Sequence, residues 1–103
     1  MTRYRVVFTA TAEAHVHAIA AWSRREQLGE PELFHRELSA AVSRLSELPM
    51  TGAAYRAASL PGLRRVLLRR TQYHVYYTVD QAEHLVSIRA VWHTARGQGP
   101  DLG

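Results

Sequence analysis

The chain has 103 residues and a formal net charge of +4, with a sequence pI near 10.1. This length fits one domain that can bury a modest hydrophobic core. Because the sequence contains no cysteine, disulfide scaffolds and thiolate zinc sites are excluded. No apolar run approaches the roughly 18 residues of a membrane helix, and the N-terminal apolar stretch is too short for a signal peptide. We therefore expect a soluble, cytoplasmic protein.

All 13 basic residues are arginines, since the sequence has no lysine. A guanidinium group stays protonated and binds phosphate or carboxylate through two hydrogen bonds, but it cannot act as a general base. Any proton transfer would depend on histidine, glutamate, aspartate or tyrosine. The basic balance fits a nucleic acid or an acidic protein partner.

Residues 4–9 predict a first strand, because apolar and polar residues alternate there. Thr9 or Thr11 can cap the helix that follows, since both side chains carry a hydroxyl acceptor. Gly29 is expected to end this helix, and Pro31 fits the first turn of a second one.

Two apolar stripes predict the helices. The second stripe recurs at steps of four and three residues, which is the spacing of one helix face, and Pro49 stops it. Two helices of similar length with a short connection form an antiparallel hairpin. The expected stripes are Ala12, Val16, Ile19 and Trp22 in the first helix, and Phe34, Leu38, Ala41, Leu45 and Leu48 in the second.

Residues 62–96 predict three consecutive strands joined by short polar turns. Read at period two, one face of this meander is apolar and the other carries guanidinium and imidazole groups. The expected apolar face holds Val66, Leu68, Val75, Tyr77, Val79, Val86, Ile88, Ala90 and Trp92. The expected opposite face holds Arg65, Leu67, Arg69, His74, Tyr76, Thr78, Leu85, Ser87, Arg89 and Val91.

The predicted order is β-α-α-β-β-β. This is an α+β fold in which the N-terminal strand and the antiparallel three-strand meander pack against the helical hairpin. Residues 1–96 are expected to form a single domain, with an irregular connection at residues 50–61. Residues 97–103 are expected to be a flexible C-terminal tail.

His15 and His17 lie two positions apart on a helix, so their side chains point away from each other. No carboxylate or thiol stands near them at a metal-ligand spacing. We therefore expect a solvated helix face rather than a metal site, and no cofactor.

Basic and aromatic residues gather on the three meander strands. Histidine, arginine and tyrosine on one face could hold a scissile phosphate and transfer a proton, or they could present a positive surface to an acidic partner. His93 at the end of the last strand could act as a general acid or base, or could hydrogen-bond the backbone. The candidates are Arg64, Arg65, Arg69, His74, Tyr76, Arg89, His93 and Arg96.

The order of elements and several short motifs resemble the RelE/ParE superfamily of bacterial type II toxins. The resemblance covers residues 4–96 and implies a small toxin neutralised by an antitoxin, whose extended or helical C-terminal segment wraps the toxin. The motifs are Leu48-Pro49 followed by Gly52, Pro61-Gly62-Leu63-Arg64-Arg65, Tyr73-His74-Val75-Tyr76-Tyr77-Thr78-Val79 and Val91-Trp92-His93-Thr94-Ala95-Arg96.

The resemblance implies one of two targets. RelE-like members are ribosome-dependent messenger-RNA endonucleases, whereas ParE-like members poison DNA gyrase. This chain has His74 where the nucleases commonly place an arginine, and Leu67 at a second basic position. Arg65 and His93 match nuclease residues, but Thr94 occupies the position of a nuclease tyrosine. The chain therefore resembles ParE more closely.

The resulting hypothesis is a ParE-like gyrase poison with no cofactor, and the alternative is a RelE-like endonuclease acting on message in the ribosome. The expected partner is a cognate ParD-like antitoxin with an acidic C-terminal segment, which could add a strand or lay a helix in a groove. The eight candidates above would bind the target or partner. Under the nuclease alternative, the catalytic residues would be Arg65, Arg69, His74 and His93.

Overall fold

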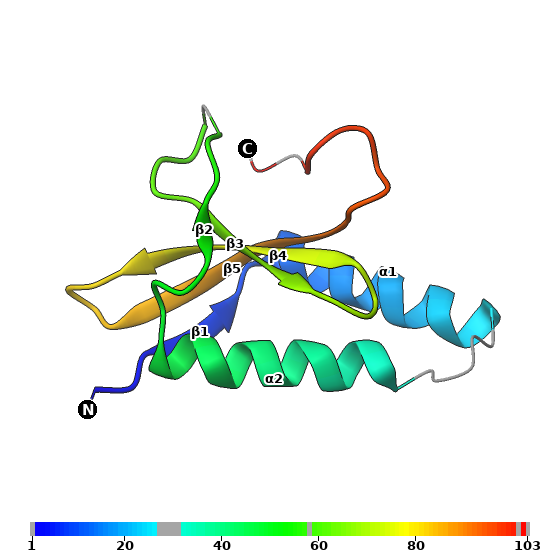
Figure 1. Cartoon of the computed structure of the whole chain (residues 1–103), viewed down its shortest axis with the longest axis horizontal. Helices are drawn as coiled ribbons and strands as arrows, with labels where there is room; N and C mark the ends of the chain where they lie inside the picture. The colour runs from blue at the N-terminus through cyan, green and yellow to red at the C-terminus, as the bar shows by residue number, and fades with distance from the viewer. Residues whose placement is uncertain (1, 27–31, 58, 101, 103) are drawn as a thin grey trace.

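A computed structural model of the chain describes residues 2–26, 32–57, 59–100 and 102. Its two helices form an antiparallel pair on one face of a single sheet (Figure 1), which confirms the predicted α+β class. The expected helix end at Gly29 and helix start at Pro31 lie outside the described residues. The elements are β1 (Arg5–Phe8), α1 (Ala10–Glu26), α2 (Leu33–Glu47), β2 (Ala53–Ala54), β3 (Arg64–Leu68), β4 (Tyr73–Asp80) and β5 (Leu85–His93).

The sheet has five strands in the order β1-β5-β4-β3-β2. The predicted meander is confirmed, because β3, β4 and β5 pair antiparallel in sequence. β1 joins β5 in parallel, so the first and last strands of the chain are neighbours. β2 was not predicted, since two alanines carry no periodic signal; it pairs antiparallel with Arg64 and Arg65 of β3.

The main core lies between the helices and the sheet. The hydroxyl of Thr9 accepts a hydrogen bond from the Ala12 amide (3.2 Å), so Thr9 caps α1 as expected. Among the described helices, none is long and apolar enough to cross a membrane. The buried residues of this core are Ala12, Ile19, Phe34, Leu38, Leu45, Leu68, Val75, Tyr77, Val86, Ile88 and Val91.

Two residues of the predicted stripes are not buried. Trp22 is 44% exposed and Leu48 is 54% exposed, so their assignment to the core is wrong. The end of α1 projects past the sheet, where no strand can cover it (Figure 1). Leu48 is the C-cap of α2 with non-helical dihedral angles, so its side chain leaves the stripe.

A β-bulge interrupts β5. Tyr76 pairs with Ala90 but Tyr77 pairs with Ile88, so Arg89 is an extra residue on β5. A bulge of this kind ends the strict alternation of side chains between the two faces of a strand.

The bulge makes three predicted face assignments wrong, those of Ala90, Val91 and Trp92. Val86 and Ile88 pack toward the helices, as expected, but Ala90 and Trp92 belong to a cluster on the other side of the sheet. Val91 takes their place in the main core and is 2% exposed. The period-two pattern therefore holds up to Ile88 and reverses beyond the extra residue.

We call the sheet surface opposite the helices the outer face. Part of it is covered by described residues of the connection between β2 and β3 and by Leu102 near the C-terminus. Both segments rise from the same side of the sheet (Figure 1). The small cluster beneath them consists of Leu63, Tyr76 and Ala90, with Tyr55, Ala57, Leu60, Trp92 and Leu102 packed around it.

The amide and the carbonyl of Gly52 are both held by hydrogen bonds. Its amide donates to the hydroxyl of buried Tyr77 (2.8 Å), and its carbonyl accepts from Nη1 of Arg64 (2.7 Å). A side chain at Gly52 would collide with the Tyr77 hydroxyl and approach the Arg65 carbonyl. These contacts hold the chain between α2 and β2 close beneath the sheet.

The turn between β3 and β4 is held by Glu37 of α2. The carboxylate accepts hydrogen bonds from the Arg70 amide (2.9 Å), the Thr71 amide (2.9 Å) and the Thr71 hydroxyl (2.6 Å). Burial alone would raise the pKa of Glu37, but the hydrogen bonds from Thr71 and Arg70 outweigh it and hold this pKa below its ordinary value. The turn is therefore fixed to the helix that faces it.

We predict that Tyr77→Phe lowers the free energy of unfolding by about 1–3 kcal/mol, because the buried Gly52 amide loses its acceptor. Urea denaturation followed by circular dichroism measures the change. Tyr4→Phe is the control, because the structure shows a ring contact with His84 for this side chain and no hydrogen bond of its hydroxyl. Equal stabilities of Tyr77→Phe and the unmodified protein would contradict the role of this bond.

Candidate functional site

Arg65 lies flat among aromatic rings on the outer face. Its guanidinium carbon is 4.6 Å from the centroid of the Tyr55 ring and 5.9 Å from that of Tyr76. Nη1 of Arg65 also donates to the Tyr76 hydroxyl (3.3 Å), and the two rings meet edge to face at 5.0 Å. A guanidinium stacked in this way keeps its N–H edge available for an anion.

His74 stands beside this arginine. The register places His74 opposite Leu67 and Tyr76 opposite Arg65, and the His74 and Tyr76 rings are 6.0 Å apart. Burial and the charge of Arg65 lower the pKa of His74. His74 is therefore mainly neutral near pH 7 and adds a polar ring, rather than a charge, to this surface.

Arg89 lies on the outer face, as its place in the alternation predicts. Its Nε donates to the hydroxyl of Thr78 (3.1 Å) on the neighbouring strand. No described carboxylate forms an ion pair with Arg65, Arg89 or Arg96, so their charges are uncompensated. The outer face therefore combines three uncompensated guanidinium groups with buried aromatic rings.

Arg96 and Trp92 form a second stack at the end of β5. The guanidinium carbon of Arg96 lies 4.1 Å from the Trp92 ring centroid. Nε1 of Trp92 donates to the carbonyl of Gln98 (2.7 Å), and Leu102 packs into the outer-face cluster. The described tail residues thus turn back over the sheet; the flexibility of residues 97–103 stays a prediction.

His93 hydrogen-bonds the backbone, one of the two roles that its position left open. Its Nδ1 accepts the amide hydrogen of Ala95 (3.0 Å), and its ring meets Tyr73 edge to face at 5.0 Å. A ring nitrogen that accepts an N–H carries no proton, so the proton of the neutral ring sits on Nε2. In this tautomer Nε2 can donate a hydrogen bond.

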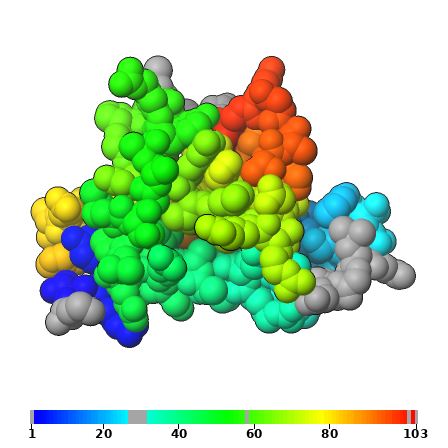
Figure 2. All heavy atoms as spheres, viewed as in Figure 1, coloured from blue at the N-terminus to red at the C-terminus, as the bar shows by residue number. Residues whose placement is uncertain are grey.

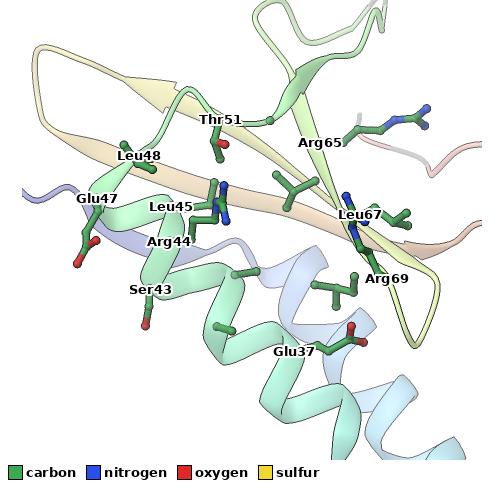
Figure 3. Close-up of a pocket in the computed structure, with 15 residues that line it drawn as sticks. Glu37, Ser43, Arg44, Leu45, Glu47, Leu48, Thr51, Arg65, Leu67 and Arg69 are labelled. Carbon is green, nitrogen blue, oxygen red and sulfur yellow. The ribbon is translucent and has the colours of Figure 1, made fainter.

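The remaining two candidates lie away from the outer-face stacks. Arg64 donates hydrogen bonds to the carbonyls of Met50 and Gly52 and so holds the loop between α2 and β2. Arg69 lines a groove between α2 and β3 (Figure 3). The structure therefore brings Arg65, His74 and Tyr76 together, and Arg69 lines a groove whose lining also includes Arg65. Tyr76 is only 3% exposed, whereas Arg65 and Tyr55 are both partly exposed.

The groove between α2 and β3 was not singled out from the sequence. It has a volume of about 960 Å³ and opens to solvent. Figure 3 shows Arg44 and Leu48 on its α2 wall and Leu67 on its β3 wall, with Glu37 at the lower end. A signal for it existed, because Leu67 is apolar at a position between two arginines on the charged side of its strand.

His15 is also placed differently from expectation. His17 is exposed as predicted, but His15 is half-buried and its Nδ1 accepts the amide hydrogen of Val91 (3.2 Å). Its ring lies 5.3 Å from that of Trp92. The solvated-face prediction is wrong for His15, because β1 ends at Phe8 and the α1 side chain supplies an acceptor that a longer strand would have provided.

We predict that stability falls as the pH drops below about 6.5. Burial, followed by the positive charge of Arg96, lowers the pKa of His15 from its ordinary value of 6.5. The unfolded chain then binds this proton more readily than the folded chain, so the stabilisation is complete above pH 6.5 and is lost toward the lower folded pKa. His74, whose pKa is also lowered, contributes with the same sign.

Urea denaturation at pH 7.5 and pH 5.5 tests this, with His15→Asn and His17→Asn as a matched pair. His15→Asn should weaken the pH dependence, whereas the exposed His17 should leave it unchanged. A pH dependence that both variants retain in full would assign the effect elsewhere.

Comparison with known proteins gives a consistent picture. Residues 6–97 match the family model described as the ParE toxin of the type II toxin-antitoxin system parDE. None of the curated proteins compared with the sequence matches it.

Solved structures of similar fold include toxin-antitoxin systems of both branches. A chain of the toxin-antitoxin complex RelBE2 from Mycobacterium tuberculosis is 27% identical, with a TM-score of 0.65 over 93% of this chain and 97% of that one. A chain of the chromosomal ParDE system from P. aeruginosa is 21% identical, with a TM-score of 0.65 over 88% and 96%. The intact RelBE complex of E. coli contains a chain that is 19% identical, with a TM-score of 0.61 over 90% and 99%. Since the family model spans most of the sequence, the chain belongs to the ParE toxin family of type II toxin-antitoxin systems.

Proposed function

We propose that this toxin is a ParE-like poison of DNA gyrase, acting in the cytoplasm and neutralised by a cognate antitoxin. The observation that carries the proposal is the contact of His93. This residue is one of the two proton-transfer candidates of the nuclease alternative, with His74, yet its Nδ1 accepts the amide hydrogen of Ala95. The ring thereby holds the backbone at the end of β5, which supports a structural role for His93 rather than proton transfer.

The other nuclease candidates support the same conclusion. Arg65 and Arg69 both line the α2–β3 groove, but no contact among the described residues joins Arg69 to His74 or His93. Leu67 brings an apolar side chain to a position where nucleases place a basic one. What remains on the outer face suits binding better than proton transfer.

We propose that the outer face contacts the target. Arg65, Arg89 and Arg96 are uncompensated there, and ring stacking or hydrogen bonding holds each guanidinium in a defined orientation. Such preorganised groups lose little conformational entropy when they bind an acidic surface or phosphate. His74 adds hydrogen-bonding capacity beside Arg65.

The partner is proposed from the relatives. Two of the similar solved structures are toxin-antitoxin complexes, RelBE2 of M. tuberculosis and RelBE of E. coli. We therefore infer a cognate, ParD-like antitoxin with an acidic segment, which suits a toxin with a net charge of +4.

The gyrase proposal predicts that purified toxin, incubated with gyrase, ATP and supercoiled plasmid, accumulates cleaved DNA. Arg65→Glu should lower the yield of cleaved DNA by about tenfold, since a reversed charge at a contact costs at least 1.4 kcal/mol in affinity. Arg24→Glu, on the exposed end of α1, is the charge-matched control. A cleavage pattern identical to the toxin-free lane at clear molar excess of toxin would overturn the proposal.

A second candidate function is ribosome-dependent cleavage of messenger RNA. The 27% identity to a chain of the RelBE2 complex favours it, as does the contact of Arg65 with Tyr76 beside His74. Primer extension on translated message would then show cuts within codons, and a His74→Ala, His93→Ala double variant would lose them. If the double variant remains fully toxic and no cuts occur, the nuclease function is excluded.

A further inference from the structure

The described residues at the C-terminus, 97–100 and 102, turn back over the outer face, and we call them the strap. They stand on the side of the molecule opposite the helices (Figure 2). A hydrogen bond fastens them to the sheet, since Nε1 of Trp92 donates to the carbonyl of Gln98 (2.7 Å). The guanidinium carbon of Arg96 lies 4.1 Å from the centroid of the same indole ring. Trp92 is therefore the point at which the strap is attached.

The strap reaches the aromatic residues beside Arg65. Leu102 packs against the cluster that contains Tyr76. Gly99 lies so near Tyr55 that a methyl group in place of its hydrogen would be 3.0 Å from the Tyr55 hydroxyl. Tyr55 and Tyr76 are also the rings that hold the guanidinium of Arg65. The strap thus occupies space next to the arginine that is proposed to contact the target.

His15 of α1 contacts the attachment point. Its Nδ1 accepts the amide hydrogen of Val91 (3.2 Å), the residue directly before Trp92, and its ring lies 5.3 Å from the indole ring. Val91 is 2% exposed, so water does not readily replace this acceptor. An imidazolium carries a proton on both ring nitrogens and has no acceptor left. A proton on His15 therefore leaves a buried amide without a partner, which is unfavourable.

The charges around His15 act in the same direction. Burial, followed by the positive charge of Arg96, lowers the pKa of His15. By linkage, a charged His15 opposes Arg96 at its place on the Trp92 ring as strongly as Arg96 opposes the proton. The described contacts of His15 on β5 are uncharged, namely the Val91 amide and the indole. The residues one turn away on α1 are not ionisable; they are Thr11, Ala12, Ala18 and Ile19.

We propose that protonation of His15 releases the strap from Trp92 and uncovers the outer face around Arg65. The imidazolium loses the Val91 amide and repels Arg96, so the indole is no longer held where it reaches the carbonyl of the strap. The neutral form, which prevails at pH 7.5, keeps the strap in place. The proposal rests on the proposed role of the outer face in target contact, but the release itself does not depend on the target.

Hydrogen exchange of the Trp92 indole in the full-length, ¹⁵N-labelled protein measures the release. The sequence has two tryptophans, so the exposed Trp22 indole in the same molecule corrects for the intrinsic effect of pH on exchange. At pH 7.5 the Trp92 indole should exchange about tenfold more slowly than that of Trp22, which corresponds to a protecting bond of about 1.4 kcal/mol. At pH 5 the ratio should fall to about one, while the core amide of Val75 stays protected.

Two substitutions of His15 separate its charge from its hydrogen bond. His15→Asn places a carbonyl oxygen near the position of Nδ1 and has no ionisable group, so the Trp92 indole should stay protected at pH 5. His15→Lys has a charge and no acceptor, so protection should be lost already at pH 7.5. His17→Lys, on the exposed side of the same helix, is the charge-matched control and should behave like the unmodified protein.

Three outcomes would overturn the proposal. The first is an exchange ratio that is equal at pH 7.5 and pH 5, and the second is a His15→Asn variant that loses protection as the unmodified protein does. The third is a His93→Asn variant that no longer responds to pH, because the switch would then be the imidazole that accepts the Ala95 amide. Should His15→Lys fail to fold, the asparagine variant alone decides.

The uncovering also predicts an effect on target binding. If the strap is closed in about nine molecules of ten, its release raises the apparent affinity of the outer face by up to about tenfold. At pH 7.5 and limiting toxin, His15→Lys should therefore increase the yield of gyrase-cleaved DNA, whereas His17→Lys should not. An unchanged yield from a variant with a released strap would overturn the covering role. Absence of cleavage with every variant would instead overturn the proposed target and leave the exchange results valid.

Discussion

The hydrogen bond between the Gly52 amide and the Tyr77 hydroxyl fixes the path of the chain where the helical layer passes into the sheet. Tyr77 is fully buried on a central strand, so its hydroxyl is a fixed point in the core. Arg64 holds the carbonyl of the same glycine, and together they leave residue 52 with no conformational freedom and no space for a side chain. β2 begins directly after this glycine, at Ala53, and Gly52 is also part of the α2–β3 groove lining.

The bulge at Arg89 has a comparable effect on the other half of the sheet. It moves Ala90 and Trp92 out of the main core and onto the outer face. Trp92 then provides the ring on which Arg96 stacks, and its indole N–H holds the tail over the sheet. One extra residue thus creates the second aromatic–arginine stack, so the two faces of this sheet are not independent.

The sequence was sufficient for the order of the elements, the antiparallel meander and most of the α2 stripe, because each depends on local periodicity. Contacts between distant residues were not predictable from it. His15 looks solvated on a helical wheel, and only the end of β1 at Phe8 creates the unpaired Val91 amide that it accepts. Likewise Leu67 was recognised as out of place, but the groove that explains its exposure requires the position of α2.

The parallel pairing of β1 with β5 has a consequence for biosynthesis. Phe8 pairs with Ile88, so the first strand to be synthesised can pair only after the last strand of the sheet has been made. Pairing over such a separation in sequence carries a large entropic cost and forms late in folding. The five-stranded sheet can therefore be completed only after nearly the whole chain has been synthesised.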